Sequence, residues 1–177
     1  MNINYIQLTE EEIELQLFQG FRRHQEVTRC WRKENGKWLL KDVSFVEDWS
    51  KAEYAFLVKC LKNTARTGGF VFGAFENKRL VGFASVENSP FGSRKQYVQL
   101  SCIHVSEESR GKGIGKRLFV IACEAGRRLG AEKLYISAHS AKESQAFYHA
   151  MGCIETVEYN KELSEAEPCD CQLEKML

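Results

Sequence analysis

The chain of 177 residues lacks the features that mark several classes of protein. With only two prolines and 13 glycines, it is neither collagenous nor rich in proline. It has no excess of charge of one sign, since its formal net charge is +1, so nothing overall favours a nucleic acid or an anionic membrane as partner. It also lacks any run of about 18 apolar residues, the length of a membrane-spanning helix.

The N-terminal stretch carries the acidic residues Glu10, Glu11 and Glu12 where a secretory signal would be apolar, and the chain has an odd number of cysteines, seven. Because disulfides form in oxidising compartments, we expect reduced thiols and a cytoplasmic location. Hydrophobic residues make up 44% of the chain, which is enough for a sizeable core at this length. We therefore predict a single domain over residues 1–177.

Three short motifs predict the N-termini of helices, because each has a hydroxyl residue followed three positions later by glutamate. In such a capping box the two side chains satisfy backbone N–H groups that the first helical turn leaves unpaired. The motifs are Thr9 with Glu12, Ser50 with Glu53, and Ser140 with Glu143. The second motif predicts the start of a long helix, which ends at Gly68 and Gly69.

The remaining segments predict strands and one further helix. Asn35-Gly36 is a strong signal for a two-residue hairpin turn between strands at 27–33 and 38–41. Further strands are expected at 70–75, 80–86, 96–105, 133–138, 153–159 and 169–177, with helices at 113–129 and from 140 to about 151. Strands that feed helices in the second half, after an antiparallel first half, indicate an α/β fold with a mixed sheet.

The strand at 96–105 has an irregular hydrophobic pattern. Val98, Leu100 and Cys102 alternate with polar residues, and the apolar phase then shifts to Ile103 and Val105. A β-bulge produces such a change of register and separates a strand from its neighbour. An imperfect strand that tolerates a cysteine explains the pattern equally well.

The turn that follows this strand has the composition of an anion site. Gly111, Gly113 and Gly115 allow the backbone to approach a ligand closely, and they precede an amphipathic helix whose first N–H groups are unpaired. The basic residues of the turn are Arg110, Lys112, Lys116 and Arg117. Together these features predict a site for a pyrophosphate.

The glycine spacing separates this turn from the common nucleotide loops. It is one residue too short for a Walker A loop, and Arg117 stands where that loop needs Ser or Thr for magnesium. The G-x-G-x-G spacing also differs from the dinucleotide-binding fingerprint. Instead the turn fits R-x-x-G-x-G, read as Arg110, Gly113 and Gly115.

With this motif the sequence resembles the GCN5-related N-acetyltransferase (GNAT) family, whose coenzyme A loop follows a bulged strand. The resemblance covers roughly residues 70–159 and includes the segment Phe147-Tyr148…Gly152. It implies a mostly antiparallel twisted sheet with a splayed, bulged strand and flanking helices. It also implies an enzyme that transfers an acetyl group from acetyl-CoA to a primary amine by direct attack in a ternary complex.

The resemblance also implies roles for individual residues. The backbone of Ile103, His104 and Val105 would pair with pantetheine. The pyrophosphate would bind the loop that contains Arg110, Gly111, Lys112, Gly113, Ile114, Gly115 and Lys116. Tyr148 would be the general acid that protonates the leaving thiolate, although it could instead be an aromatic residue of the core.

The sequence departs from the family pattern in two places. Ala141 replaces an asparagine that often contacts pantetheine, so neighbouring Ser140 is the candidate for that contact. The general base is also missing, because Gln99 and Ser101 stand where the family often has Glu or His. Deprotonating an aliphatic ammonium costs roughly 4–5 kcal/mol at neutral pH, so some group must assist.

Several candidates for that group remain, and with them a second function. His139 and His104 have a suitable intrinsic pKa, Glu87 is a weaker candidate, and a water relay without a single base is also open. The absent base equally fits a non-catalytic module of the same fold that binds acyl-CoA.

The last expectations concern metals, partners and the layout of the chain. Cys169 and Cys171 alternate with polar residues as in a half-buried strand, and no second ligand pair stands nearby, so we predict no metal site. We assign residues 1–69 to the acceptor side, 70–159 to the acetyl-CoA-binding core and 160–177 to a C-terminal strand. The acceptor class is open, as is a homodimer, and no nucleic acid or membrane partner is expected.

Overall fold

The computed structural model describes residues 2–177 and contains a seven-stranded sheet with the order β1-β4-β5-β6-β7-β9-β8. Neighbouring strands are antiparallel except for β6 and β7, which run parallel. The strands are β1 (Asn4–Gln7), β4 (Phe70–Glu76), β5 (Arg79–Val86), β6 (Tyr97–Val105), β7 (Lys133–Ala138), β8 (Ile154–Glu155) and β9 (Cys171–Met176). The predicted mixed α/β fold with a mostly antiparallel sheet is confirmed.

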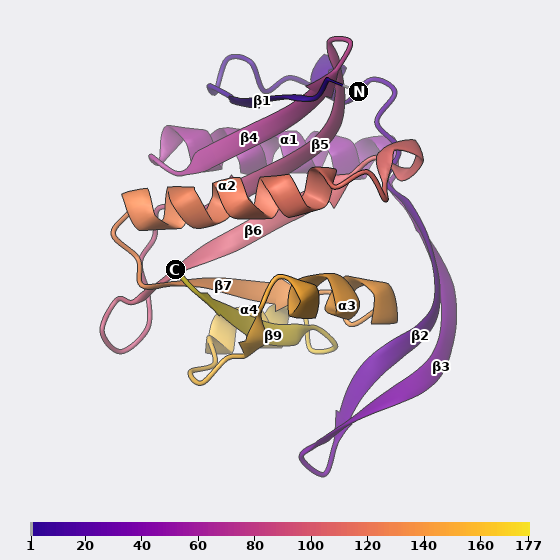
Figure 1. Cartoon of the computed structure of the whole chain (residues 1–177), viewed down its shortest axis with the longest axis vertical. Coiled ribbons are helices and arrows are strands. Elements are labelled where there is room, and N and C mark those ends of the chain that lie inside the picture. The colour runs from indigo at the N-terminus through magenta and orange to yellow at the C-terminus, as the bar shows by residue number, and fades with distance from the viewer. Residues whose placement is uncertain (1) are drawn as a thin grey trace.

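Helices cover both faces of this sheet (Figure 1). They are α1 (Lys51–Arg66), α2 (Ile114–Arg128), α3 (Lys142–Ala150) and α4 (Lys161–Ala166), with short 3-10 helices η1 (Leu15–Phe18) and η2 (Glu107–Ser109). Figure 1 shows α2 in front of β5 and β6 and α1 behind them. None of the helices in residues 2–177 has the length and apolar character needed to span a membrane.

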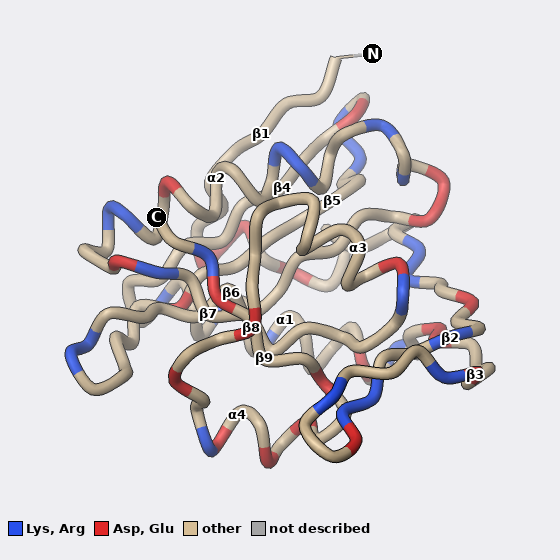
Figure 2. The backbone as a smooth tube through the Cα atoms, turned by 60° about the horizontal axis from the view of Figure 1, so that its bottom comes forward, with Lys and Arg blue, Asp and Glu red and all other residues tan. Residues whose placement is uncertain are grey.

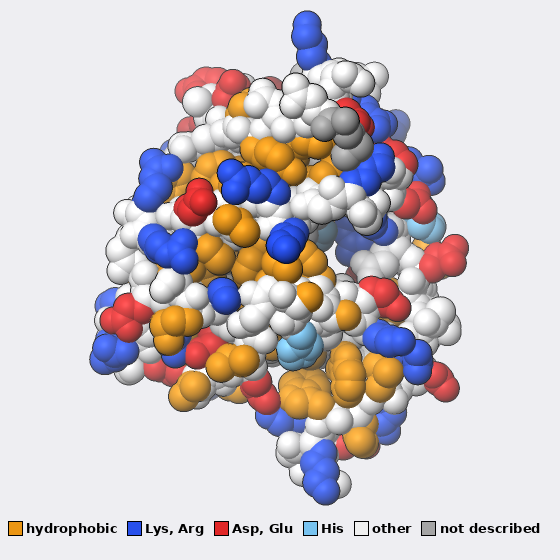
Figure 3. Space-filling view, in the orientation of Figure 1, with side chains coloured by type: hydrophobic (Ala, Val, Ile, Leu, Met, Phe, Trp, Pro, Cys, Tyr) orange, Lys and Arg blue, Asp and Glu red, His pale blue; other side chains and the backbone are white. Residues whose placement is uncertain are grey.

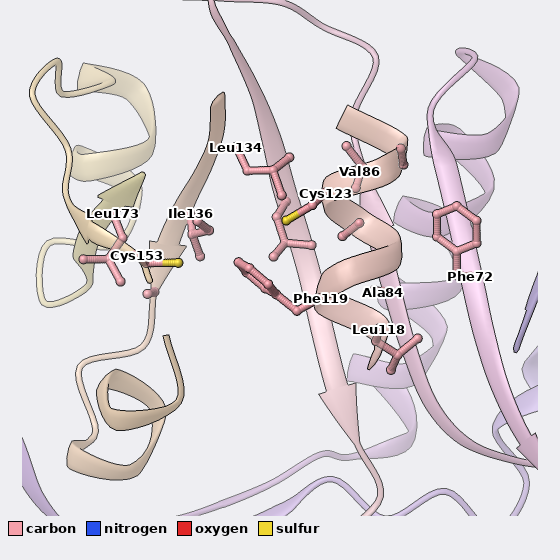
Figure 4. Close-up of a cluster of buried hydrophobic side chains, with 14 of the residues drawn as sticks. Phe72, Ala84, Val86, Leu118, Phe119, Cys123, Leu134, Ile136, Cys153 and Leu173 are labelled. Atoms are coloured by element: carbon pink, nitrogen blue, oxygen red, sulfur yellow. The ribbon is translucent and has the colours of Figure 1, made fainter. Parts of the chain in front are cut away.

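The sheet therefore separates two hydrophobic cores. One core lies under α2, where Leu118, Phe119 and Cys123 point onto the sheet beside Leu134 and Ile136 of β7 (Figure 4). The other core lies under α1 and η1 and contains Phe18, Leu61 and Phe83, among others. Burial of this apolar surface, at about 25 cal/mol per Å², provides the main stabilisation of both layers.

A long hairpin forms a separate two-stranded sheet of β2 (His24–Glu34) and β3 (Lys37–Asp48). The predicted turn is confirmed, because Asn35 and Gly36 adopt the left-handed φ values of 50° and 76° that such a turn needs. The strands are longer than predicted and run alongside the end of the molecule that carries α3 (Figure 1). Lys and Arg residues are interspersed with Asp and Glu along the hairpin (Figure 2), so its surface carries charges of both signs.

The three predicted capping boxes have different outcomes. The box of Ser50 and Glu53 is confirmed, with both reciprocal hydrogen bonds present at the start of α1. The prediction of a helix at Thr9 is wrong, because only the Thr9 N–H bonds to Glu12 (2.8 Å) and the chain continues as turns into η1. The motif is local, whereas the burial of neighbouring Ile13 in the α1 core determines the path of this segment.

The prediction of a capping box at Ser140 is also wrong. Helix α3 begins one residue later than expected, with Ala141 as its N-cap and no side-chain cap. The Ser140 hydroxyl instead accepts a hydrogen bond from Arg32 of the hairpin (2.7 Å), and the Ser140 carbonyl accepts one from the Trp31 N–H (2.8 Å). Contact with the hairpin therefore outweighs local capping.

The C-terminal part differs from the prediction in its strand lengths. The strand expected at 153–159 is reduced to β8, and strand β9 begins at Cys171 rather than at residue 169. After β8 the Val157 N–H donates to the Glu174 carboxylate (3.2 Å), so the segment leaves the sheet. Strand β1 and helix α4 were not predicted from the sequence.

Candidate active site

Strands β6 and β7 pair only over a short stretch and then diverge. Their parallel pairing covers Tyr97–Gln99 against Lys133–Tyr135. On the other side of β6, Val86 pairs with Leu100 and Ser85 with Cys102, so Ser101 is an extra residue. The predicted bulge is therefore confirmed, and it lies where the two strands begin to separate.

The bulge lies one residue earlier than the hydrophobic pattern suggests. Leu100, Ile103 and Val105 belong to the core under α2, whereas Cys102 packs on the core under α1. Cys102 therefore packs on the opposite face of the sheet from Leu100, and it does not continue the alternation that Val98 and Leu100 begin. The Ser101 hydroxyl is held at the bulge by the Ser85 hydroxyl, 2.8 Å away.

The loop between β6 and α2 presents free backbone donors. None of the N–H groups from Gly111 to Lys116 donates to a backbone carbonyl in residues 2–177, and the first bond of the helix is from Arg117 to Gly113 (3.1 Å). Gly111 and Gly113 have left-handed φ values of 75° and 80°, and no atom lies within 4 Å of a Cβ built on either. A side chain there would project into open space, which a ligand can occupy instead.

Gly115 serves a different purpose, because it lies inside α2. A Cβ on Gly115 would stand 3.4 Å from Cε2 of Phe147. Its small size therefore allows α2 and α3 to approach each other, which brings the loop close to the side chains of α3.

These elements enclose a cavity of about 560 Å³. Figure 3 shows hydrophobic side chains gathered between α2 and α3 on this face of the molecule, with Lys and Arg side chains nearby. The cavity is lined by Gln25, Glu26, Ile103, His104, Val105, Ser109, Arg110, Gly111, Gly113, Ile114, Gly115, Lys116, Glu143, Ser144, Phe147, Tyr148 and Met151. An apolar wall that leads to a ring of N–H donors suits a ligand with an apolar arm and an anionic end.

The structure thus brings the residues predicted to bind the cosubstrate to this cavity, with two exceptions. Lys112 is exposed and does not line the cavity. Ser140 also lies off its wall, because its hydroxyl is turned to Arg32 of the hairpin. Arg110 lines the cavity and also donates from Nε to the Val105 carbonyl (3.1 Å), which ties the loop to β6.

Other lining residues were missed. Glu143, Ser144 and Phe147 lie on α3, and Met151 directly follows it, so the helical periodicity around Tyr148 could have found them. Gln25 comes from the hairpin. No local signal predicts its position, because the docking of the hairpin is a tertiary contact.

A second cavity of about 340 Å³ lies where β6 and β7 have separated. Its walls are Arg23, Glu47, Trp49, Leu100, Ser101, Cys102, Ile103, His104, Ile136, Ser137, His139, Ser144, Tyr148, Glu167 and Asp170. Four residues line both cavities, so the two spaces meet there, beside the Tyr148 side chain. They are Ile103, His104, Ser144 and Tyr148.

The Tyr148 hydroxyl is a free proton donor at this junction. It makes no hydrogen bond to residues 2–177, while its ring packs against Phe147 and Phe119 with centroids 5.2 and 6.3 Å away. Burial raises the pKa of Tyr148 above its usual value of 10.0, so the phenol keeps its proton at neutral pH.

His104 has surroundings that oppose protonation. Its ring packs edge-on against Trp49 and lies beside Phe83, with centroids 4.8 and 5.4 Å away. Burial, assisted by the charge of Arg23, lowers the pKa of His104 to about 3. A neutral imidazole with so low a pKa takes up almost no proton at neutral pH, which makes it a poor base.

Both ring nitrogens of His139 are engaged. Its Nδ1 accepts from the Ala141 N–H (3.1 Å), and Nε2 lies 3.2 Å from Oε1 of Glu47. The other oxygen of Glu47 accepts from Nη2 of Arg23 (2.7 Å). His139 and Arg23 together lower the pKa of Glu47 to about 2, so the carboxylate is ionised. This arrangement links the hairpin to the end of β7.

The sequence profile of the acetyltransferase (GNAT) family matches residues 14–153. No curated protein matches the chain. Among solved structures, one described as a streptothricin acetyltransferase from Bacillus anthracis, in complex with acetyl coenzyme A, is 14% identical, with a TM-score of 0.75 and coverage of 100% of this chain and 99% of the other.

Two further structures share the fold. Nourseothricin acetyltransferase is 16% identical, with a TM-score of 0.70 and coverage of 98% and 96% of the two chains. PaiA N-acetyltransferase from Thermoplasma acidophilum, in complex with coenzyme A, is 15% identical, with a TM-score of 0.61 and full coverage of both chains. Since the family profile spans most of the sequence, the chain belongs to the acetyltransferase (GNAT) family and is an acetyl-CoA-dependent N-acetyltransferase.

Proposed function

We propose that the larger cavity binds acetyl-CoA with its pyrophosphate on the N–H groups of Gly111–Lys116. The open space beside Gly111 and Gly113 and the free donors of the loop support this placement. The apolar arm of the cosubstrate then runs along the backbone of β6 from Val105 to Ile103. Its thioester reaches the point where the two cavities meet, beside Tyr148.

The second cavity receives the acceptor amine. The side chains that line this cavity include three carboxylates and one guanidinium. They are Glu47, Glu167, Asp170 and Arg23. This balance favours an acceptor with positive charge over an anionic one. In this division residues 1–69 contribute Arg23, Glu47 and Trp49 to the acceptor side, and the core at 70–159 provides most of the lining for the cosubstrate, with Gln25 and Glu26 added by the hairpin.

The chemistry follows from the junction of the cavities. The amine attacks the thioester carbonyl directly, because both substrates occupy adjoining spaces at the same time. The C–S bond then breaks, and the Tyr148 hydroxyl donates its proton to the thiolate of coenzyme A. A phenol that remains protonated at neutral pH is suited to this step.

The observation that carries the proposal is the position of the free Tyr148 hydroxyl between a cavity with anion-binding N–H groups and a cavity with carboxylates. The test is release of coenzyme A thiol from acetyl-CoA in the presence of spermidine, kanamycin, lysine or a lysine-rich peptide. Turnover with at least one cationic amine is expected. Binding of acetyl-CoA without turnover of any of these amines would instead favour a module that only binds the cosubstrate.

A further inference from the structure

We propose that Asp170 is the catalytic base that removes a proton from the acceptor amine, an inference that rests on the proposed function. Asp170 stands directly before β9 and lines the second cavity together with Tyr148. It places a carboxylate in the space assigned to the acceptor, whose lining also includes the group that donates a proton to the leaving thiolate.

The contacts of Asp170 hold the carboxylate in place and leave part of it available. Its Oδ2 accepts from the Ser137 hydroxyl (3.2 Å), and its backbone N–H donates to the Glu167 carbonyl (3.0 Å). The antiparallel pair of Ala138 and Cys171 anchors the adjoining backbone to β7. Oδ1 makes no hydrogen bond to residues 2–177, so an ammonium in the cavity can donate to it.

The other carboxylates near this space are less suitable. Both oxygens of Glu47 are engaged, by His139 and by Arg23. Glu167 is exposed to solvent on the rim of the cavity. Glu87 does not line the cavity, and its Oε1 accepts from the hydroxyls of Thr64 and Ser101.

The two histidines are also less suitable. His104 is neutral in its aromatic surroundings, with a pKa of about 3. The Nδ1 lone pair of His139 is used by the Ala141 N–H (3.1 Å). Asp170 therefore combines an available basic atom with a place on the cavity wall, which neither histidine does.

The surroundings of Asp170 increase its affinity for a proton. Burial and the neighbouring carboxylates of Glu167 and Glu47 raise the pKa of Asp170, whereas His139 and the Ser137 hydroxyl act in the opposite direction. A carboxylate with a raised pKa accepts a proton from an ammonium more readily than an ordinary one. The same negative charges attract the ammonium into the cavity.

Proton transfer to Asp170 begins the reaction. One N–H bond of the ammonium breaks and its proton passes to Oδ1 of Asp170, which leaves a neutral amine with a free electron pair. This pair forms the C–N bond, the C–S bond breaks, and sulfur takes the Tyr148 proton. The second proton of the nitrogen returns through water to Tyr148, and the proton on Asp170 passes to solvent. The net products are the amide, coenzyme A thiol and one proton.

The test compares two nucleophiles that differ in their need for a base. The first is the aliphatic amine of the panel with the fastest turnover, which is protonated at neutral pH, with a pKa near ~10. The second is hydroxylamine, which is largely unprotonated there. Asp170→Asn should lower kcat for the first by about 100-fold or more and change the rate with hydroxylamine by less than about threefold.

The pH profile and two further variants complete the test. The rise of kcat with pH that reports a carboxylate base should disappear in Asp170→Asn and return in part in Asp170→Glu. Glu165→Gln, at an exposed carboxylate of α4 that does not line the cavity, should keep both rates and the profile. Equal loss with both nucleophiles would show a structural role, and unchanged kcat with the aliphatic amine would exclude Asp170 as the base.

A measurement without turnover separates this inference from the proposed function. In the unaltered protein with coenzyme A bound, the ¹³C carboxyl resonance of Asp170, assigned through Asp170→Asn, should shift when spermidine, kanamycin, lysine or the lysine-rich peptide is added, each in a separate titration. A shift without turnover in any assay would remove the transferase proposal and keep the contact between amine and carboxylate. If the resonance shifts with none of these amines, Asp170 is not the base, with or without turnover.

Discussion

His139 and Glu47 connect the body of the molecule to the hairpin, with Nε2 of the imidazole 3.2 Å from Oε1 of the carboxylate. Glu47 is near the end of β3, and His139 directly follows β7. Because Arg23 binds the other oxygen of Glu47, one carboxylate joins both ends of the hairpin to the distant segment that follows β7. This contact closes one wall of the second cavity.

Glu47→Gln should lower the free energy of unfolding at neutral pH by about 1–2 kcal/mol. The substitution removes the negative charge that balances Arg23, whose side chain is only 8% exposed. The pKa of Glu47 in the fold, about 2, is below the ordinary 4.5, so its contribution is complete above about pH 5 and is lost as the pH falls toward 2. Urea denaturation of both proteins at pH 7, 4 and 3 should show the difference shrinking. A difference that is constant over this range would contradict the ionic origin.

Tyr148→Phe should lower kcat by one or two orders of magnitude with little change in the dissociation constant for acetyl-CoA. The substitution removes the hydroxyl and keeps the ring that packs on Phe119 and Phe147. Thiol release measures kcat, and calorimetry measures binding. If kcat is unchanged, Tyr148 is not the acid and serves only as a packing residue.

Gly113→Val should abolish binding of acetyl-CoA, because the new side chain would project into the open space in front of the N–H groups. Gly130→Val is the matched control. Gly130 has a similar φ, 78° against 80°, and equally open surroundings, but it follows the far end of α2. Both variants should lose similar stability, whereas only the first should lose affinity in calorimetry. Retained affinity in Gly113→Val would contradict the assignment of the loop.

Ser50→Ala should lower the free energy of unfolding by about 1 kcal/mol, since it removes the N-cap of α1. Thr9→Ala is a control with the same sequence motif, because the Thr9 hydroxyl caps no helix in the structure. Thermal denaturation of both variants should show a decrease in Tm for Ser50→Ala and almost none for Thr9→Ala. Equal decreases would mean that the two motifs act alike in spite of the different structures.

The capping motifs show where sequence patterns are reliable. At Ser50 the local hydrogen bonds and the buried face of α1 favour the same structure, so the prediction is confirmed. At Ser140 the local motif competes with Arg32 of the hairpin, and the distant partner takes the hydroxyl. A pattern that spans four residues cannot report a partner from another part of the chain.

The residues of the candidate site also differ in whether the sequence predicts them. The loop from Arg110 to Lys116 and the tyrosine of α3 could be recognised from short motifs. The acceptor side could not, because Asp170 and Arg23 have no motif around them and meet only in the folded cavity. The hydrophobic alternation around Asp170 correctly suggested a strand nearby, yet it carried no information on what the carboxylate faces.

Local sequence was sufficient to predict the hairpin turn at Asn35-Gly36, the capped start of α1 and the loop before α2, since each depends on backbone conformations and hydrogen bonds between near neighbours. The separation of β6 from β7, the position of the hairpin and the shared cavity of Asp170 and Tyr148 depend on tertiary contacts. The reason is that these features arise from packing between segments distant in the chain, and burial and charge act there through space.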